Sequence, residues 1–188
     1  MLTNDTEVGV YMWTERDLNS RNKAMKMLEN EHHYLRYLME EWHPIVLDFE
    51  NDRFEEKEDA VLAFQALRNK LKDFIEPWKK HTDKEEKYFF PALGMYIGKE
   101  QGPIVSIEEE HQEIDGYIGH FFYHSRGNIE EMSYQELKKV VQDAGEAFEV
   151  IMIHFVKEET VLFPMVDKVM KIDDLQQLTA NLHSLITK

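Results

Sequence analysis

The stretch HTDKEEKYFFP, residues 81–91, occurs again 73 positions later as HFVKEETVLFP, residues 154–164. Six of the eleven positions are identical, among them the histidine, both glutamates of a Lys-Glu-Glu triplet and the final proline. Each copy therefore places a histidine and a glutamate four residues apart. Because side chains four apart on an α-helix point in nearly the same direction, each copy predicts a His/Glu pair on one helix face.

The composition limits what kind of protein this is. The chain has 188 residues, of which 43% are hydrophobic and 31% charged, as is typical of one soluble globular domain. The formal net charge of −15 disfavours nucleic acid and anionic membranes as partners, because like charges repel. Asp5 and Glu7 occupy the positions where a signal peptide would carry positive charge, so we expect the protein in the cytoplasm.

The chain contains no cysteine. This excludes disulfides, thiolate nucleophiles, cysteine-ligated zinc and conventional iron–sulfur ligation together. Any metal must therefore be bound by histidine, carboxylate or water.

Helical periodicity runs through most of the chain and predicts an all-α fold with a single domain over residues 1–188. We expect an up-and-down four-helix bundle over about 19–170, preceded by a tail over 1–18 and followed by a short helix that lies across the bundle. The expected helices are about 19–48, 57–97, 103 onward, 134–169 and 172–186.

Each long helix has an apolar seam that is interrupted by polar residues. The interruptions, in chain order, are His32, His81, Glu85, His111, His154 and Glu158. Burial of these side chains without compensation would cost several kcal/mol for each group. A pair of metal ions removes this cost if each ion takes two histidines and both glutamates bridge. Imidazole and carboxylate together suit iron or manganese.

The same seams continue beyond the His/Glu pairs. Their spacing predicts Tyr88 and Ala92 as the next buried positions in the second helix, and Val161 and Met165 in the fourth. The prolines at the end of each repeat, six residues after the glutamate, are expected to kink or end these helices.

Four stretches resemble the hemerythrin-like, or HHE cation-binding, domains: ENEHHYL around His32, HTDKEEKYFFP, GPIVSIEEEH ending at His111, and HFVKEETVLFP. The resemblance covers about residues 20–170. It implies a four-helix bundle with a non-haem di-iron centre. We expect an oxo or hydroxo bridge between the two iron ions, and manganese or zinc could take the place of the iron.

The set of four histidines and two glutamates is similar to that of the di-iron proteins called repair of iron centres. Those proteins are linked to recovery of iron–sulfur clusters after nitrosative or oxidative stress. They commonly carry a small cysteine-containing N-terminal domain, whereas this chain has about eighteen cysteine-free residues there.

Several functions follow from such a centre. The first is binding or sensing of a small diatomic ligand, dioxygen or nitric oxide. The second is donation of iron to damaged iron–sulfur proteins, and the third is redox catalysis on nitric oxide or peroxide. A purely structural bundle is the alternative without a metal.

Three further histidines compete for a place in the site. His33 could replace His32, but seam spacing favours His32 because the next position turns about 100° away. His120 and His124 stand four apart and could form an extra metal site or the third-helix histidine pair of a classical hemerythrin, but we expect them on the surface or at a helix end. They are too far from His111 for the same centre, roughly 13 to 20 Å along the helix.

Four other residues have open roles. Asp115 could reach a metal or face solvent. Glu31 and Glu110, each directly before a candidate ligand, could gate access, bond a neighbouring ligand or lie on the surface. Tyr88 could donate to a bridging carboxylate or pack in the core.

Overall fold

The computed structural model describes residues 23–100 and 102–184. The helices are α1 Lys23–Glu50, α2 Lys57–Lys84, α3 Phe90–Ile97, α4 Pro103–His124, α5 Tyr134–Lys157, α6 Phe163–Val169 and α7 Ile172–Ser184. Two π-helices, η1 Glu85–Phe89 and η3 Glu158–Leu162, and one 3-10 helix, η2 Ile129–Glu131, complete the elements. The predicted tail and the predicted first residues of the first helix lie outside the described part.

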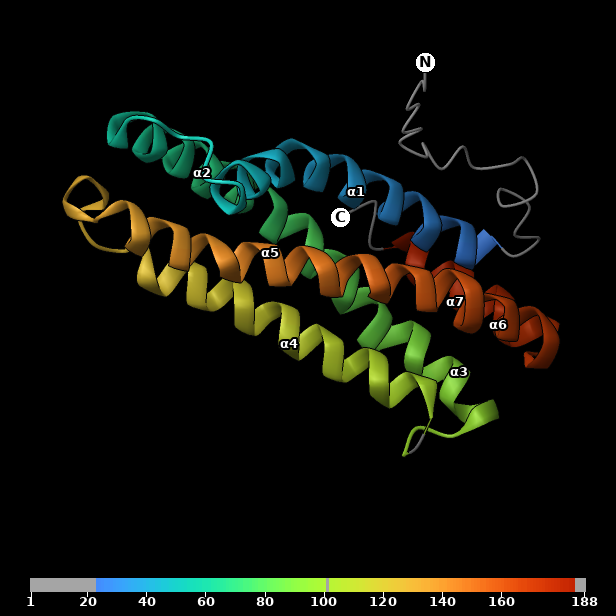
Figure 1. Cartoon of the computed structure of the whole chain (residues 1–188). Helices are drawn as coiled ribbons and strands as arrows, with labels where there is room; N and C mark the ends of the chain where they lie inside the picture. Colours follow the sequence, from blue (N-terminus) through green and yellow to red (C-terminus); the bar gives the residue numbers. More distant parts are fainter. Residues whose placement is uncertain (1–22, 101, 185–188) are drawn as a thin grey trace, which may run out of the picture.

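The long helices form the predicted bundle (Figure 1). The elements α2, η1 and α3 make one continuous helical run, and α5, η3 and α6 make another. The most extensive packing is between α4 and α5 and between α1 and α2, and α1 also packs on α5. Residues 23–100 and 102–184 contain no β-strand. The expected all-α, up-and-down four-helix bundle is therefore confirmed.

The interior of the bundle consists of two apolar clusters with a polar layer between them. One cluster surrounds Trp42 and Phe74, and the other surrounds Phe89 and Phe163. His32 marks the boundary on α1, since Leu28 belongs to one cluster and Leu35 to the other. The six polar seam residues make up this layer, and so the site is closed by apolar packing at both ends.

Beyond the polar layer, the buried face of the helical run α2–η1–α3 differs from the prediction. Phe89 and Leu93 are fully buried, whereas the expected positions, Tyr88 and Ala92, are only partly buried. The cause is η1, because a π-turn holds one more residue than an α-turn and delays the buried face by one position. Tyr88 packs against the apolar cluster and forms no bond to Glu85 within the described residues.

The helical run α5–η3–α6 shows the same shift. Leu162 and Val166 are fully buried, whereas Val161 is 45% exposed and Met165 partly buried. Here η3 supplies the extra residue. The predicted seams beyond the site were therefore wrong by one position in both helices, for the same reason.

Neither Pro91 nor Pro164 ends its helix, since α3 and α6 continue past them. The residue before each proline donates its backbone N–H to the carbonyl of Glu85 in η1 and of Glu158 in η3. Proline has no N–H, and its ring clashes with the carbonyl four residues earlier in a regular α-helix. The wider π-turn accommodates the proline, and it begins at the glutamate of the site.

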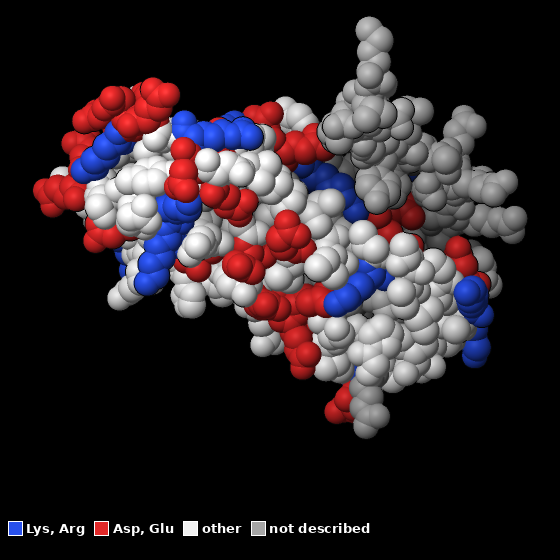
Figure 2. Space-filling view, in the orientation of Figure 1, with Lys and Arg blue, Asp and Glu red and all other residues white. Residues whose placement is uncertain are grey.

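The last helix, α7, contacts α1 and η1 and buries Leu178 and Leu182 in the cluster around Phe89. It therefore covers one end of the bundle. No described helix is long and apolar enough to span a bilayer. Acidic side chains are distributed over the face in Figure 2, with basic ones between them, in keeping with the net charge of −15.

Candidate metal centre

The structure brings together all six polar seam residues that the sequence singled out. Their side chains are almost completely buried, with exposed fractions between 0% and 3%. They form two groups that share both glutamates, and within each group ligand atoms lie within 4.8 Å of one another. The His32 group comprises His32, His81, Glu85 and Glu158, and the His111 group comprises Glu85, His111, His154 and Glu158.

The histidine Nε2 atoms face the two carboxylates. His81 Nε2 lies 3.3 Å from Oε1 of Glu85, and His111 Nε2 lies 3.4 Å from Oε2 of the same side chain. Glu85 thus presents one oxygen to each group, which is the arrangement that a bridging carboxylate requires. Oε2 of Glu158 lies 3.1 Å from His32 Nε2 and 3.5 Å from His154 Nε2.

These separations fit ligands of a common ion. Two atoms that each lie about 2.1 Å from an ion are roughly 3.0 to 3.4 Å apart for angles between 90° and 109°. His32 Nε2 and His81 Nε2 are 3.1 Å apart. Among the residues the structure describes, both oxygens of Glu85 and Glu158 and Nε2 of His111 and His154 have no hydrogen-bond partner. Buried polar atoms are rarely left unpaired, so these residues fit a metal pair.

Burial also sets the protonation states of the site. It raises the pKa values of Glu85 and Glu158 well above the usual value of a glutamic acid. It lowers the pKa of His32 well below its usual value, and that of His154 to about 3. Both directions favour uncharged side chains, because the groups are removed from water. A bound cation would favour the deprotonated carboxylates instead.

A second ring of four glutamates surrounds the histidines, and we call these residues the outer glutamates. Each one approaches the Nδ1 atom of a histidine on the neighbouring helix, so the contacts run once around the bundle. The four contacts are His81 with Glu31 at 3.0 Å, His111 with Glu86 at 2.9 Å, His154 with Glu110 at 3.4 Å and His32 with Glu159 at 2.8 Å. Three of these contacts are hydrogen bonds, and an Nδ1–H that donates to a carboxylate leaves the Nε2 lone pair free for a metal. His154 Nδ1 forms no hydrogen bond within the described residues.

Basic side chains hold three of the outer glutamates. Arg36 donates to Glu159 at 2.8 Å, Lys84 pairs with Glu31, and Lys157 pairs with Glu110. Within the described part of the chain, Glu86 forms no ion pair with lysine or arginine.

Glu86 also differs from another outer glutamate in solvent exposure: its side chain is 47% exposed, compared with 16% for Glu159. The position on α4 that corresponds to Arg36 on α1 is Asp115. The ring is therefore least enclosed at the His111 group.

Aromatic rings pack directly on the site. Phe155 stacks on His32 with ring centroids 4.2 Å apart. The Trp78 ring lies 5.6 Å from the rings of both His111 and His154. Phe90 stacks on His111 at 5.8 Å. These rings exclude water from the space around the two groups.

The competing residues occupy other places. His33 is exposed, while His32 is fully buried, as seam spacing predicted. Asp115 is exposed and accepts a hydrogen bond from Trp78 Nε1 at 3.1 Å. His120 and His124 lie on the exposed side of α4, away from the centre.

The sequence analysis did not identify Glu86 and Glu159 as part of the site. Each is the second glutamate of a Lys-Glu-Glu triplet, and both triplets belong to the repeated stretch that contains the ligands. The repetition of the second glutamate was the available signal. Of the open roles of Glu31 and Glu110, contact with a neighbouring histidine is the one that the structure shows.

The chain matches a known protein family. The family model described as hemerythrin HHE cation binding domain matches residues 24–166. No curated protein and no solved structure gave a significant match.

Proposed function

The chain belongs to the hemerythrin HHE cation-binding domain family, and from that premise we propose that it is a non-haem di-iron protein that binds or senses dioxygen or nitric oxide. The observation that carries the proposal is the pair of buried groups that share both glutamates. In this proposal, the two histidines of each group would hold one iron, and both shared glutamates would be ligands of the pair. The six ligands are His32, His81, Glu85, His111, His154 and Glu158.

The iron pair would supply a redox-active centre with affinity for small diatomic molecules. The residues of the chain keep that centre selective. Glu31, Glu86 and Glu159 accept hydrogen bonds from Nδ1 atoms and so keep Nε2 of those imidazole rings facing inward. Trp78, Phe90 and Phe155 keep bulk water out. Because the ligand side chains are at most 3% exposed, a small neutral guest fits the site better than a metabolite.

One surface groove lies next to the site. It has a volume of about 780 Å³, runs between α1 and α2, and is lined by Glu31, His81 and Lys84 among others. His81 is only 1% exposed, so the groove stops at the ring of outer glutamates. In the proposed function, a small molecule approaches from this side.

We propose that the protein acts in the cytoplasm, without nucleic acid or membrane as a partner.

The first test is elemental analysis of protein from iron-replete cells, together with its absorption spectrum. We expect about two irons per chain and absorption bands of bridged ferric iron in the near ultraviolet. A folded protein without metal would contradict the proposal.

The second test separates ligand binding from iron donation. Nitric oxide is added to the reduced protein without oxygen, and the protein is then separated from small molecules. Binding or sensing predicts a reversible spectral change with the iron retained. Loss of iron to an apo iron–sulfur acceptor would favour donation instead, and turnover with an electron donor would favour an oxidoreductase.

A further inference from the structure

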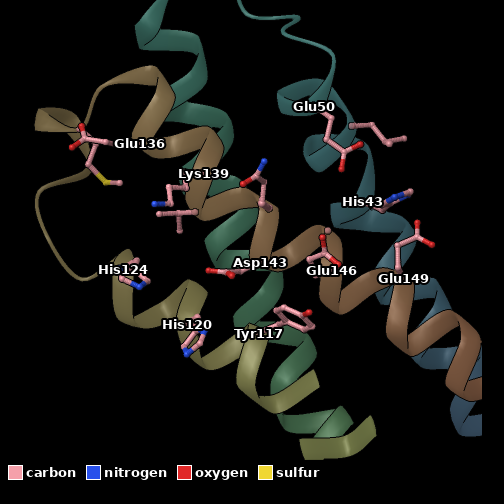
Figure 3. Close-up of a pocket in the computed structure, with 15 residues that line it drawn as sticks. His43, Glu50, Tyr117, His120, His124, Glu136, Lys139, Asp143, Glu146 and Glu149 are labelled. Carbon is pink, nitrogen blue, oxygen red and sulfur yellow. The ribbon is translucent and has the colours of Figure 1, made fainter. Parts of the chain in front are cut away.

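A second cluster of metal-binding side chains lies on the surface, outside the centre. α4 and α5 pack side by side, and a groove of about 980 Å³ is lined by residues of these two helices and of α1. Its lining includes His120 and His124 from α4 and Asp143 from α5. Figure 3 shows the two histidines one turn apart on α4, with the Asp143 carboxylate on the facing helix.

The spacing of the histidines allows both to bind one ion. Residues four apart on a helix differ by about 40° in direction and about 6 Å in height, so two imidazoles at this spacing can share a metal. The ring centroids of His120 and His124 are 6.4 Å apart. Both side chains are exposed, so the rings are free to rotate toward a common ion.

Asp143 lies on the facing helix and is the third candidate ligand, although the ligand atoms of the three residues do not all lie within 4.8 Å of one another. It is partly buried, and this burial raises its pKa, while the two histidines opposite act in the reverse direction. In the residues placed by the structure, the side chains of His120, His124 and Asp143 form no hydrogen bond or ion pair. A cation would therefore not have to displace a partner.

The groove favours a cation electrostatically. Glu136, Glu146 and Glu149 also line it, against a single lysine, Lys139. Two imidazoles and a carboxylate suit zinc, copper or nickel better than calcium or magnesium, which prefer oxygen ligands.

We propose that His120, His124 and Asp143 form a peripheral site for a divalent transition-metal ion of the zinc type, bound between α4 and α5. The site is separate from the buried centre, because nine residues of helix place His120 roughly 13 Å along α4 from His111. An ion there would cross-link the two helices next to the turn that joins them.

The test uses the iron-loaded full chain without a polyhistidine tag, dialysed against Zn²⁺, with zinc and iron measured in the same sample. We expect about one zinc per chain in addition to the iron, as for a site with one set of ligands. The double variant His120→Ala, His124→Ala should lose this zinc. Asp143→Asn should weaken zinc binding by about tenfold.

His183→Ala is the matched control, because this exposed histidine lies on α7, outside the groove. It should bind zinc as the unchanged protein does. The proposal is overturned if the double variant retains the zinc, if His183→Ala loses it equally, or if the zinc bound equals the iron released. Both histidines are exposed, so their replacement should leave the fold and the iron content unchanged.

Discussion

The His32 group and the His111 group each take one histidine from a copy of the repeated stretch and share the glutamates of both copies, but their surroundings differ. Around the His32 group, both outer glutamates are held by a basic side chain, and their contacts to Nδ1 measure 2.8 and 3.0 Å. Around the His111 group, Glu86 is 47% exposed and Glu110 lies 3.4 Å from His154. The two copies of the repeat supply the same ligand types, a histidine and a glutamate each, so the groups differ in how firmly the outer glutamates hold their histidines.

The largest effect is expected when a glutamate that both groups share is replaced. Glu158→Leu removes a carboxylate that belongs to both groups, so both metal ions should be lost. In chelator-treated protein, the same change should raise the free energy of unfolding by about 1 to 4 kcal/mol, because an apolar side chain replaces a buried acid. Elemental analysis and urea denaturation measure the two effects.

A variant that keeps two metal ions per chain would show that Glu158 is not a bridge. A variant that loses metal but is also less stable without it would show that the carboxylate has a structural role that the distances do not reveal.

A smaller effect should follow when one group alone is changed. His111→Ala leaves the four side chains of the His32 group in place, so metal content should fall from about two ions to about one. Gln112→Ala on the exposed side of α4 is the control and should keep both ions. Complete metal loss in His111→Ala would mean that the His32 group does not hold an ion by itself.

The outer glutamates test the difference between the groups directly. Glu31→Gln should weaken metal binding by about 10 to 100-fold, since Glu31 orients His81 and is itself held by Lys84. Glu86→Gln should weaken it by less than about tenfold, because water already competes for this exposed carboxylate. Competition with a coloured chelator measures both affinities.

Glu40→Gln, an exposed position on the same helix as Glu31, is the control for that experiment. An equal or larger loss in Glu86→Gln than in Glu31→Gln would remove the distinction between the two groups.

The smallest effect is expected for Asp115, which occupies the position on α4 that corresponds to Arg36 on α1. Asp115→Ala removes the acceptor of the Trp78 N–H, so the free energy of unfolding should fall by about 1 kcal/mol. Metal content should stay the same, because Asp115 contacts Trp78 and not a ligand. Loss of metal in this variant would instead place Asp115 at the centre.

Much of this architecture was predictable from the sequence. The gaps in four apolar seams identified the six residues of the candidate centre, because a polar residue in a seam has to be compensated. Seam spacing also chose His32 over its neighbour correctly. Only two of the four outer glutamates were candidates from the sequence. Glu86 and Glu159 were missed because they lie on the polar side of their helices and look like ordinary surface residues.

The π-turns could not be read from periodicity. A seam with the spacing of an α-helix continues through Tyr88 and Val161, and both positions are apolar in the sequence. The one-residue shift depends on hydrogen bonds from the residue before each proline to the carbonyls of Glu85 and Glu158. Those bonds depend on backbone geometry, which the apolar pattern does not encode.

The central claim is that one pair of metal ions is bridged by both shared glutamates. The most direct test is X-ray diffraction from crystals of the iron-loaded protein, with data collected on both sides of the iron absorption edge. The account predicts two anomalous peaks inside the bundle, each in contact with Glu85 and Glu158. A single peak, or peaks that contact only one of these glutamates, would contradict it.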